Sequence, residues 1–141
     1  MEERPPETGD GVAVIVRRPE EIAQARDLTL EVAAEAGLDL EKANFLAFAV
    51  SEVTANALLH GHSAADVRVT ASAAEVTVEV RDTGSGFRPA PPDQAVPDPH
   101  ADHGRGLWLV EQLVDVVEID TGPGGTTVRL TMHRASGVME P

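Results

Sequence analysis

The chain has 141 residues, of which 42% are hydrophobic and only 3% aromatic, so it is long enough for one domain with an aliphatic core. Its 11 basic and 24 acidic residues give a net charge of −13, which disfavours unassisted binding to nucleic acid or to anionic membranes. The lack of cysteine excludes disulfides and thiol chemistry and, with no bilayer-spanning stretch and no recognisable signal peptide, favours a cytoplasmic location.

The first half of the chain predicts one strand followed by two helices. A run of mostly β-branched residues begins at Val12 and is typical of a strand. Pro19 is suited to the first turn of a helix, and Gly37 is suited to the C-cap that ends it. Asp39 can cap the second helix. In chain order we therefore expect a flexible acidic tail over residues 1–10, a strand over 12–16, and helices over 19–36 and 39–61.

The second half predicts a β-hairpin, a long loop, a helix and a second pair of strands. Valine alternates with polar residues on either side of a short turn over 72–74, which is the pattern of a hairpin. Residues 88–103 hold five of the ten prolines and show no helical period, so we expect an irregular loop that could serve as a lid. The elements expected here are strands over 67–71 and 76–80, a helix from about Gly104, strands over 116–120 and 126–132 around a turn over 122–125, and a C-terminal tail over 134–141. Residues 11–133 would then form a single domain.

Glu52, Asn56 and His60 are polar residues spaced four apart within an apolar helical segment. Residues four apart lie on one face of a helix. From Phe45 to Leu59 the segment is apolar almost all round, which is typical of a helix buried in a core. Because burying an unpaired carboxylate costs several kcal/mol, we interpret this face as the edge of a polar cleft. The alternative is a solvated stripe on a half-exposed helix, and the motif alone does not separate the two.

Two Gly-x-Gly pairs flank the expected loop, and each offers backbone amides to a ligand. The first pair is Gly84 and Gly86, and the second, Gly104 and Gly106, opens the expected helix. A helix N-terminus provides N–H groups without intrahelical partners and the positive end of the helix dipole, which together suit phosphate. Asp82 ends a strand just before the first pair, where its carboxylate could accept a hydrogen bond from an exocyclic amine such as that of adenine. Each feature alone also occurs in ordinary turns and caps.

The order and spacing of these groups over residues 45–130 resemble the motifs of the gyrase, Hsp90, histidine kinase and MutL (GHKL) superfamily of ATP-binding domains. Within it the chain is most similar to small bacterial anti-sigma factors that are also serine kinases. The resemblance implies an α/β sandwich (α+β) of the Bergerat type, with a mostly antiparallel mixed sheet, helices on one face and a lid loop. The matching segments are Glu52-x-x-x-Asn56-Ala57-x-x-His60-Gly61, Asp82-x-Gly84-x-Gly86, Gly104-Arg105-Gly106-Leu107 and Gly125-Thr126-Thr127-Val128-Arg129-Leu130.

The same resemblance implies a role for each matching residue. Asn56 would be the Mg²⁺ ligand, and a neutral amide oxygen suits a hard ion that also takes phosphate oxygens and water. Glu52 would be the general base that takes the proton from an attacking hydroxyl. His60 also stands in the motif, but a histidine at a helix end is more often a capping or structural group than a catalyst or a ligand contact. The other implied contacts are Asp82 and Thr126 at adenine, Gly84 and Gly86 at the base and sugar, and Gly104, Arg105, Gly106 and Leu107 at the phosphates.

By resemblance, the protein is expected to be an ATP-dependent serine/threonine kinase that acts as an anti-sigma factor. It would phosphorylate a serine of a STAS-type anti-anti-sigma protein and hold a sigma factor once that antagonist is released, and it could form a homodimer. The alternative is a nucleotide-binding module that sequesters a partner without turnover. The two differ in whether Glu52 acts as a base.

Other chemistries fit the sequence less well. No Gly-x-x-x-x-Gly-Lys-Ser/Thr loop is present, and Lys42 is the only lysine, which disfavours P-loop and eukaryotic-type kinases. The histidines have no zinc-site spacing. A detached catalytic domain of a sensor histidine kinase is disfavoured because no helix with a phosphoacceptor histidine precedes residue 12.

Overall fold

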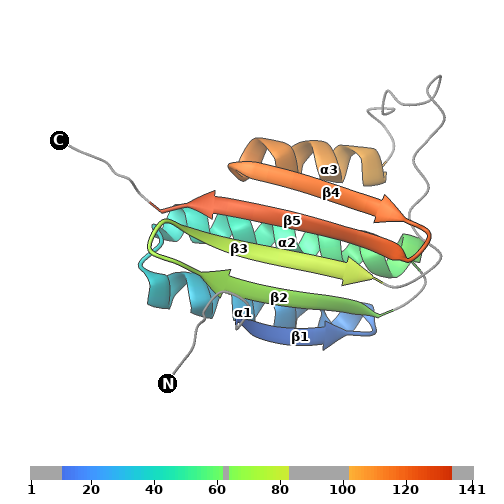
Figure 1. Ribbon diagram of the computed structural model, residues 1–141, viewed down its shortest axis with the longest axis horizontal. Coiled ribbons are helices and arrows are strands. Elements are labelled where there is room, and N and C mark those ends of the chain that lie inside the picture. Colours follow the sequence, from blue (N-terminus) through green and yellow to red (C-terminus); the bar gives the residue numbers. More distant parts are fainter. Residues whose placement is uncertain (1–10, 62–63, 83–101, 135–141) are drawn as a thin grey trace.

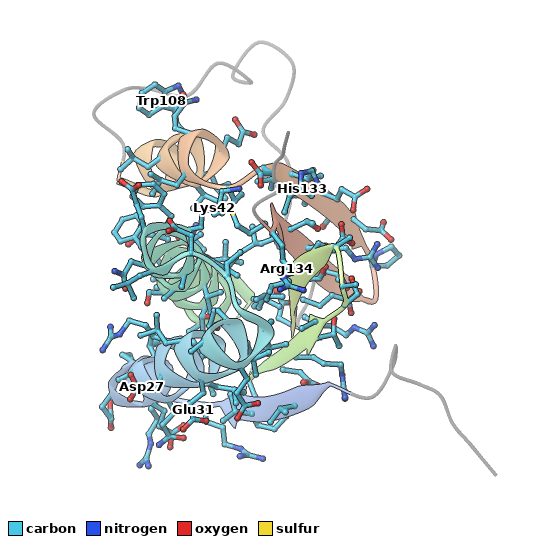
Figure 2. The ribbon with its side chains drawn as sticks, turned by 90° about the vertical axis from the view of Figure 1, so that its left-hand side faces the viewer. Asp27, Glu31, Lys42, Trp108, His133 and Arg134 are labelled. Carbon is cyan, nitrogen blue, oxygen red and sulfur yellow. The ribbon has the colours of Figure 1, made fainter. Side chains whose placement is uncertain are left out.

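A computed structural model describes residues 11–61, 64–82 and 102–134, which form a sheet layer and a helix layer (Figure 1). The strands pair in the order β1-β2-β3-β5-β4, and all four pairings are antiparallel. The helices cover one face of this sheet (Figures 1 and 2). The elements are β1 (Val12–Val16), the 3-10 helix η1 (Pro19–Glu21), α1 (Ile22–Ala36), α2 (Leu40–Gly61), β2 (Ala65–Ala71), β3 (Glu75–Asp82), α3 (Asp102–Leu113), β4 (Val116–Gly122) and β5 (Gly125–His133).

The core lies between the helices and the sheet, and it is aliphatic. Alternate residues of the central strands point toward the helices and are buried. The opposite face is polar, and there Arg129 bonds Glu79 at 2.6 Å, which raises the pKa of Arg129 above its ordinary value. A slip of one residue would exchange these two faces, so the burial pattern fixes the register. The buried strand residues include Val67, Val69, Val76, Val78, Val80, Val128, Leu130 and Met132, and α2 adds Leu46, Val50 and Val53.

Glu21 and Gly37 flank α1 and account for where the helix begins and ends. Glu21 accepts hydrogen bonds from the backbone N–H of Arg17 at 2.8 Å and from Arg18 Nη2 at 3.1 Å, and these two bonds lower the pKa of Glu21. At the other end Gly37 adopts a left-handed conformation with φ of +83°. The N–H groups of Gly37 and Leu38 then bond carbonyls in the last turn of α1, which is a Schellman motif.

Replacing Gly37 with alanine is expected to lower the free energy of unfolding by about 1 kcal/mol, because a side chain disfavours the left-handed conformation. Gly124→Ala is the matched control, since a Cβ there would meet no heavy atom within 4 Å. Urea unfolding of the two variants beside the wild type measures both effects. An equal loss in the two variants would contradict the assignment of the strain to the backbone of Gly37.

The structure confirms the predicted strands, hairpin and helices and corrects three details. Pro19 begins a 3-10 turn that precedes α1, rather than α1 itself. α3 begins at Asp102, two residues before the expected start at Gly104, so residues 102 and 103 belong to the helix and not to the expected loop. The sheet was expected to be mixed but mostly antiparallel, and all four of its described pairings are antiparallel. Arg134, the first residue of the expected C-terminal tail, is described and bonds the carbonyls of Ala73 and Ala74. The rest of the expected tails, and the expected loop before residue 102, lie outside the described residues. No described helix has the length and apolarity needed to cross a membrane.

Candidate nucleotide-binding site

Glu52 and Asn56 lie at the margin between the buried and the exposed surface of α2. Both side chains are half-buried, whereas neighbouring Val53 is buried and Ala55 is exposed. A half-buried position lets a carboxylate or an amide reach a cleft without the cost of full burial. This is the position that the cleft-edge interpretation requires. His60 lies in the last turn of α2, and its side chain is outside the described part of the chain.

The flank of α2 that carries Asn56 faces α3. Lys42 near the start of α2 lies 3.6 Å from Asp115, just beyond the end of α3, measured from Nζ to Oδ2. The two helices run antiparallel and side by side (Figures 1 and 2). Asn56 follows Lys42 by about four helical turns, so it lies on the same flank. Because both helices rise equally per residue, the Glu52 to Asn56 segment lies beside the first turns of α3.

The sheet contributes three polar residues at the end nearest this segment. Asp82 closes β3 and pairs with Thr126 of β5, which in turn pairs with Thr121 of β4. Asp82 and Thr126 are 5% and 7% exposed, and all three residues are on the helix-facing side of the sheet. The hydroxyl oxygens of Thr121 and Thr126 are 2.8 Å apart. We call Asp82, Thr126 and Thr121 the polar row.

The polar row and the C-terminal half of α2 lie at the same end of the molecule. β2 begins at Ala65, which pairs with Asp82, and α2 ends at Gly61 only a few residues earlier. α3 also begins at this end (Figure 1). The topology therefore brings together a carboxylate and an amide on α2, a buried carboxylate and two hydroxyls on the sheet, and the N–H groups of a helix start.

The other predicted site residues are only partly described. Gly104, Arg105 and Gly106 lie in the first turns of α3, and the side chain of Arg105 is outside the described part of the chain. Leu107 is half-buried and packs against the core. Gly84 and Gly86 lie outside the described residues. Among the described residues, no group of three or more histidine or acidic side chains is placed to hold a metal ion.

Sequence reasoning missed Thr121. Its partner Thr126 stands in a recognisable motif, but Thr121 stands in none and reaches the row only through the pairing of β4 with β5. The available signal was the Gly122–Gly125 turn, which fixes the register of this hairpin and so places Thr121 opposite Thr126.

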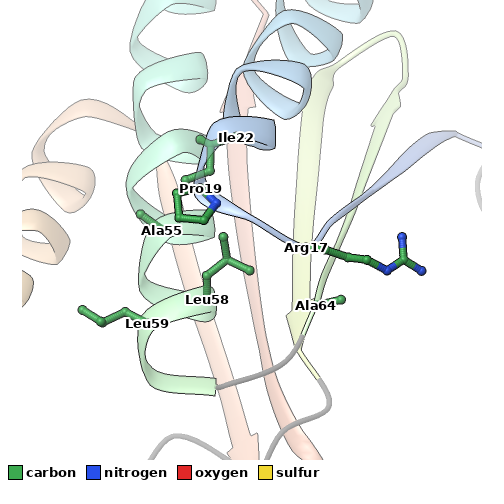
Figure 3. Close-up of a pocket in the computed structure, with 7 residues that line it drawn as sticks. All are labelled: Arg17, Pro19, Ile22, Ala55, Leu58, Leu59 and Ala64. Atoms are coloured by element: carbon green, nitrogen blue, oxygen red, sulfur yellow. The ribbon is translucent and has the colours of Figure 1, made fainter.

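A separate apolar pocket of about 540 Å³ lies between the C-terminal half of α2 and the segment that leads from β1 through η1 into α1 (Figure 3). Its position beside η1 and the start of α1 separates it from the flank of Asn56, so it is not the candidate nucleotide site. The pocket is lined by Arg17, Pro19, Ile22, Ala55, Leu58, Leu59 and Ala64.

Comparison with protein families gives one match that covers most of the chain. Residues 15–132 match the family model described as the histidine kinase-like ATPase domain. No curated protein matches the chain.

Solved structures show the same fold. The histidine kinase domain of a blue-light activated histidine kinase from Erythrobacter litoralis EL346 is 24% identical, with a TM-score of 0.54 over 79% of this chain and 63% of that one. A structure of the RsbU and RsbW domains of a Mycobacterium tuberculosis protein is 22% identical, with a TM-score of 0.60 over 91% of this chain and 34% of that one. The chain thus spans less than two thirds of either structure, and at these identities the likeness concerns the fold alone.

Proposed function

The chain belongs to the histidine kinase-like ATPase domain family, and on that premise we propose that it is an Mg-ATP-dependent serine/threonine kinase that acts as an anti-sigma factor. The observation that carries the proposal is the convergence at one end of the molecule of the half-buried Glu52 and Asn56, the polar row and the start of α3. These groups supply acceptors and donors suited to a base, a metal and a phosphate chain.

The polar row and α3 would bind the nucleotide at its two ends. The carboxylate of Asp82 would accept from the exocyclic amine of adenine, with Thr126 beside it. At the other end, backbone N–H groups of the first turn of α3 would bind phosphate oxygens, and Gly104 and Gly106 leave that backbone without side chains in the way. The remaining proposed contacts are Gly84 and Gly86 at the base and sugar, and Arg105 and Leu107 at the phosphates.

Glu52 and Asn56 would serve the chemical step. Glu52 would take the proton from a serine hydroxyl of the substrate protein while the serine oxygen bonds to the γ-phosphorus. The bond from that phosphorus to the bridging oxygen breaks, and its electron pair leaves with ADP. Asn56 fits Mg²⁺ because its side chain offers an amide oxygen, the type of ligand that this hard ion accepts. Bound Mg²⁺ would neutralise phosphate charge.

The proposed partners are a STAS-type anti-anti-sigma protein as the substrate and a sigma factor as the alternative partner. This finer assignment is supported by the form of the first motif, from Glu52 to Gly61. The net charge of −13 adds a physical argument. A phosphoserine brings nearly two negative charges, so phosphorylation of the antagonist would favour its release from an acidic protein. The kinase, freed of its antagonist, would then be available to bind the sigma factor.

Trp108 offers a direct test of nucleotide binding. It is 56% exposed on α3 and directly follows Leu107 (Figure 2). Titration with ATP and Mg²⁺ is expected to change its fluorescence, and calorimetry of Trp108→Phe checks that binding persists without the reporter. Incubation with labelled ATP and candidate antagonists, each beside its serine-to-alanine variant, then tests the kinase reaction. A chain that binds no ATP by either method would refute the proposal.

A further inference from the structure

The apolar pocket of about 540 Å³ shown in Figure 3 is open to the solvent side of α2. Ala55 and Leu59 line it and are both exposed, and Leu59 is 63% exposed although it is a large aliphatic residue. Pro19 and Ile22 line it from η1 and the start of α1 (Figure 3). A hollow with apolar walls gains free energy when an apolar group of another molecule covers it.

Glu52 lies on the same side of α2 as the mouth of this pocket. Ala55 and Leu59 follow Glu52 by three and seven residues, and residues at these spacings face the same way on a helix. At 100° per residue, Glu52 lies between Ala55 and Asn56 around the helix. From Glu52 to Leu59 the helix rises about 10 Å. A folded protein that brings a hydroxyl to Glu52 is wider than this distance, so it also covers the pocket.

Arg17 places a positive charge at the margin of the pocket. The residue is exposed, and among the described residues no carboxylate forms an ion pair with its guanidinium. That guanidinium extends away from the apolar walls (Figure 3). In a chain with a net charge of −13, an arginine without an acidic partner favours a binding partner that supplies the carboxylate. The complementary surface is therefore an aliphatic side chain with an acidic residue near it.

We propose that the pocket is the docking site for an aliphatic side chain of the antagonist protein, an inference that rests on the proposed function. This side chain would lie about 10 Å from the serine that is phosphorylated, which is about three residues of extended chain. An acidic residue of the antagonist would lie near Arg17. Docking would hold the serine at Glu52 and would add affinity for the protein substrate, not for ATP. The pocket would thus distinguish one serine-containing protein from another by shape.

The test uses the antagonist that the labelled-ATP assay identifies, with its concentration varied at saturating Mg-ATP. Leu59→Ala removes part of one wall and is expected to raise the KM for the antagonist about tenfold, with kcat within about twofold. Ala55→Leu fills the pocket and is expected to have the same effect. Leu40→Ala is the matched control, since Leu40 is 72% exposed at the opposite end of the same helix. Thermal unfolding and calorimetry with Mg-ATP establish that each variant is folded and binds nucleotide.

The antagonist provides a second test of the same contact. Alanine replaces, one at a time, its exposed aliphatic residues within about 10 Å of the serine. One replacement is expected to raise the KM of the wild-type kinase and to add little when the kinase carries Ala55→Leu. Such non-additivity identifies two residues that touch.

The outcomes separate this inference from the proposed function. An unchanged KM in Leu59→Ala and Ala55→Leu, or a lower kcat at an unchanged KM, would overturn the docking role while leaving the kinase in place. Weaker binding of the sigma factor at an unchanged KM would assign the pocket to that partner instead and would also overturn it. A wild-type protein that phosphorylates no antagonist would overturn the proposed function, and this inference with it.

Discussion

Replacing Glu52 with glutamine is expected to lower phosphoryl transfer at least about 100-fold while ATP affinity stays within about threefold. Glutamine keeps the size and half-buried position of the side chain but cannot take a proton. The loss should therefore appear in the turnover rate and not in binding. Phosphoserine formed on the antagonist under single-turnover conditions measures the rate, and calorimetry measures ATP affinity.

Glu41→Gln is the matched control for this experiment. Glu41 lies in the first turn of the same helix, is exposed, and is at the end of α2 far from the polar row. It should transfer phosphate at the wild-type rate. If Glu52→Gln does so too, Glu52 is not the base. If the wild type binds ATP tightly but phosphorylates no antagonist, the alternative of a binding module without turnover is favoured.

Replacing Asn56 with alanine is expected to abolish the dependence of ATP affinity on Mg²⁺. The amide oxygen is the single protein ligand proposed for the ion, so its removal should lower the affinity for Mg-ATP at least about tenfold. Affinity measured in EDTA should change much less, because the groups proposed to contact the base and phosphates remain. Calorimetric titrations of the wild type and of Asn56→Ala with ATP, each with and without Mg²⁺, give the four affinities to be compared.

Asn44→Ala controls for the loss of an asparagine from α2. Asn44 is exposed on another side of the helix from Asn56 and should keep the full Mg²⁺ dependence. An Asn56→Ala protein that still binds Mg-ATP more tightly than ATP alone would contradict the assignment of the ligand. An equal loss with and without Mg²⁺ would instead indicate contact with the nucleotide or a structural role.

Much of the fold could be predicted because its signals are local. The end of α1 follows from Gly37, and the β2–β3 hairpin follows from alternation on either side of a short turn. Glu52 and Asn56 stood out because polar residues are conspicuous in an apolar helix. The pairing of β3 with β5 was not readable in this way, because the strands are separated by α3 and β4 and the register depends on the assembled core. Thr121 faces Thr126 within the local β4–β5 hairpin, but the row that both share with Asp82 depends on this β3–β5 pairing.

The contact between Lys42 and Asp115 holds the C-terminal end of α3, so a tilt of this helix would move mainly its N-terminal end. Just beyond the C-terminal end, Asp115 lies 3.6 Å from the Lys42 ammonium and accepts a hydrogen bond from the backbone N–H of His133 at 2.7 Å. The other end, which begins at Asp102, lies at the candidate site. A helix of this length extends about 18 Å, so a tilt of about 10° around the held end moves its first turn by about 3 Å. That distance is the length of one hydrogen bond. If the start of α3 binds phosphate as proposed, a small rotation about the distant held end would make or break those contacts.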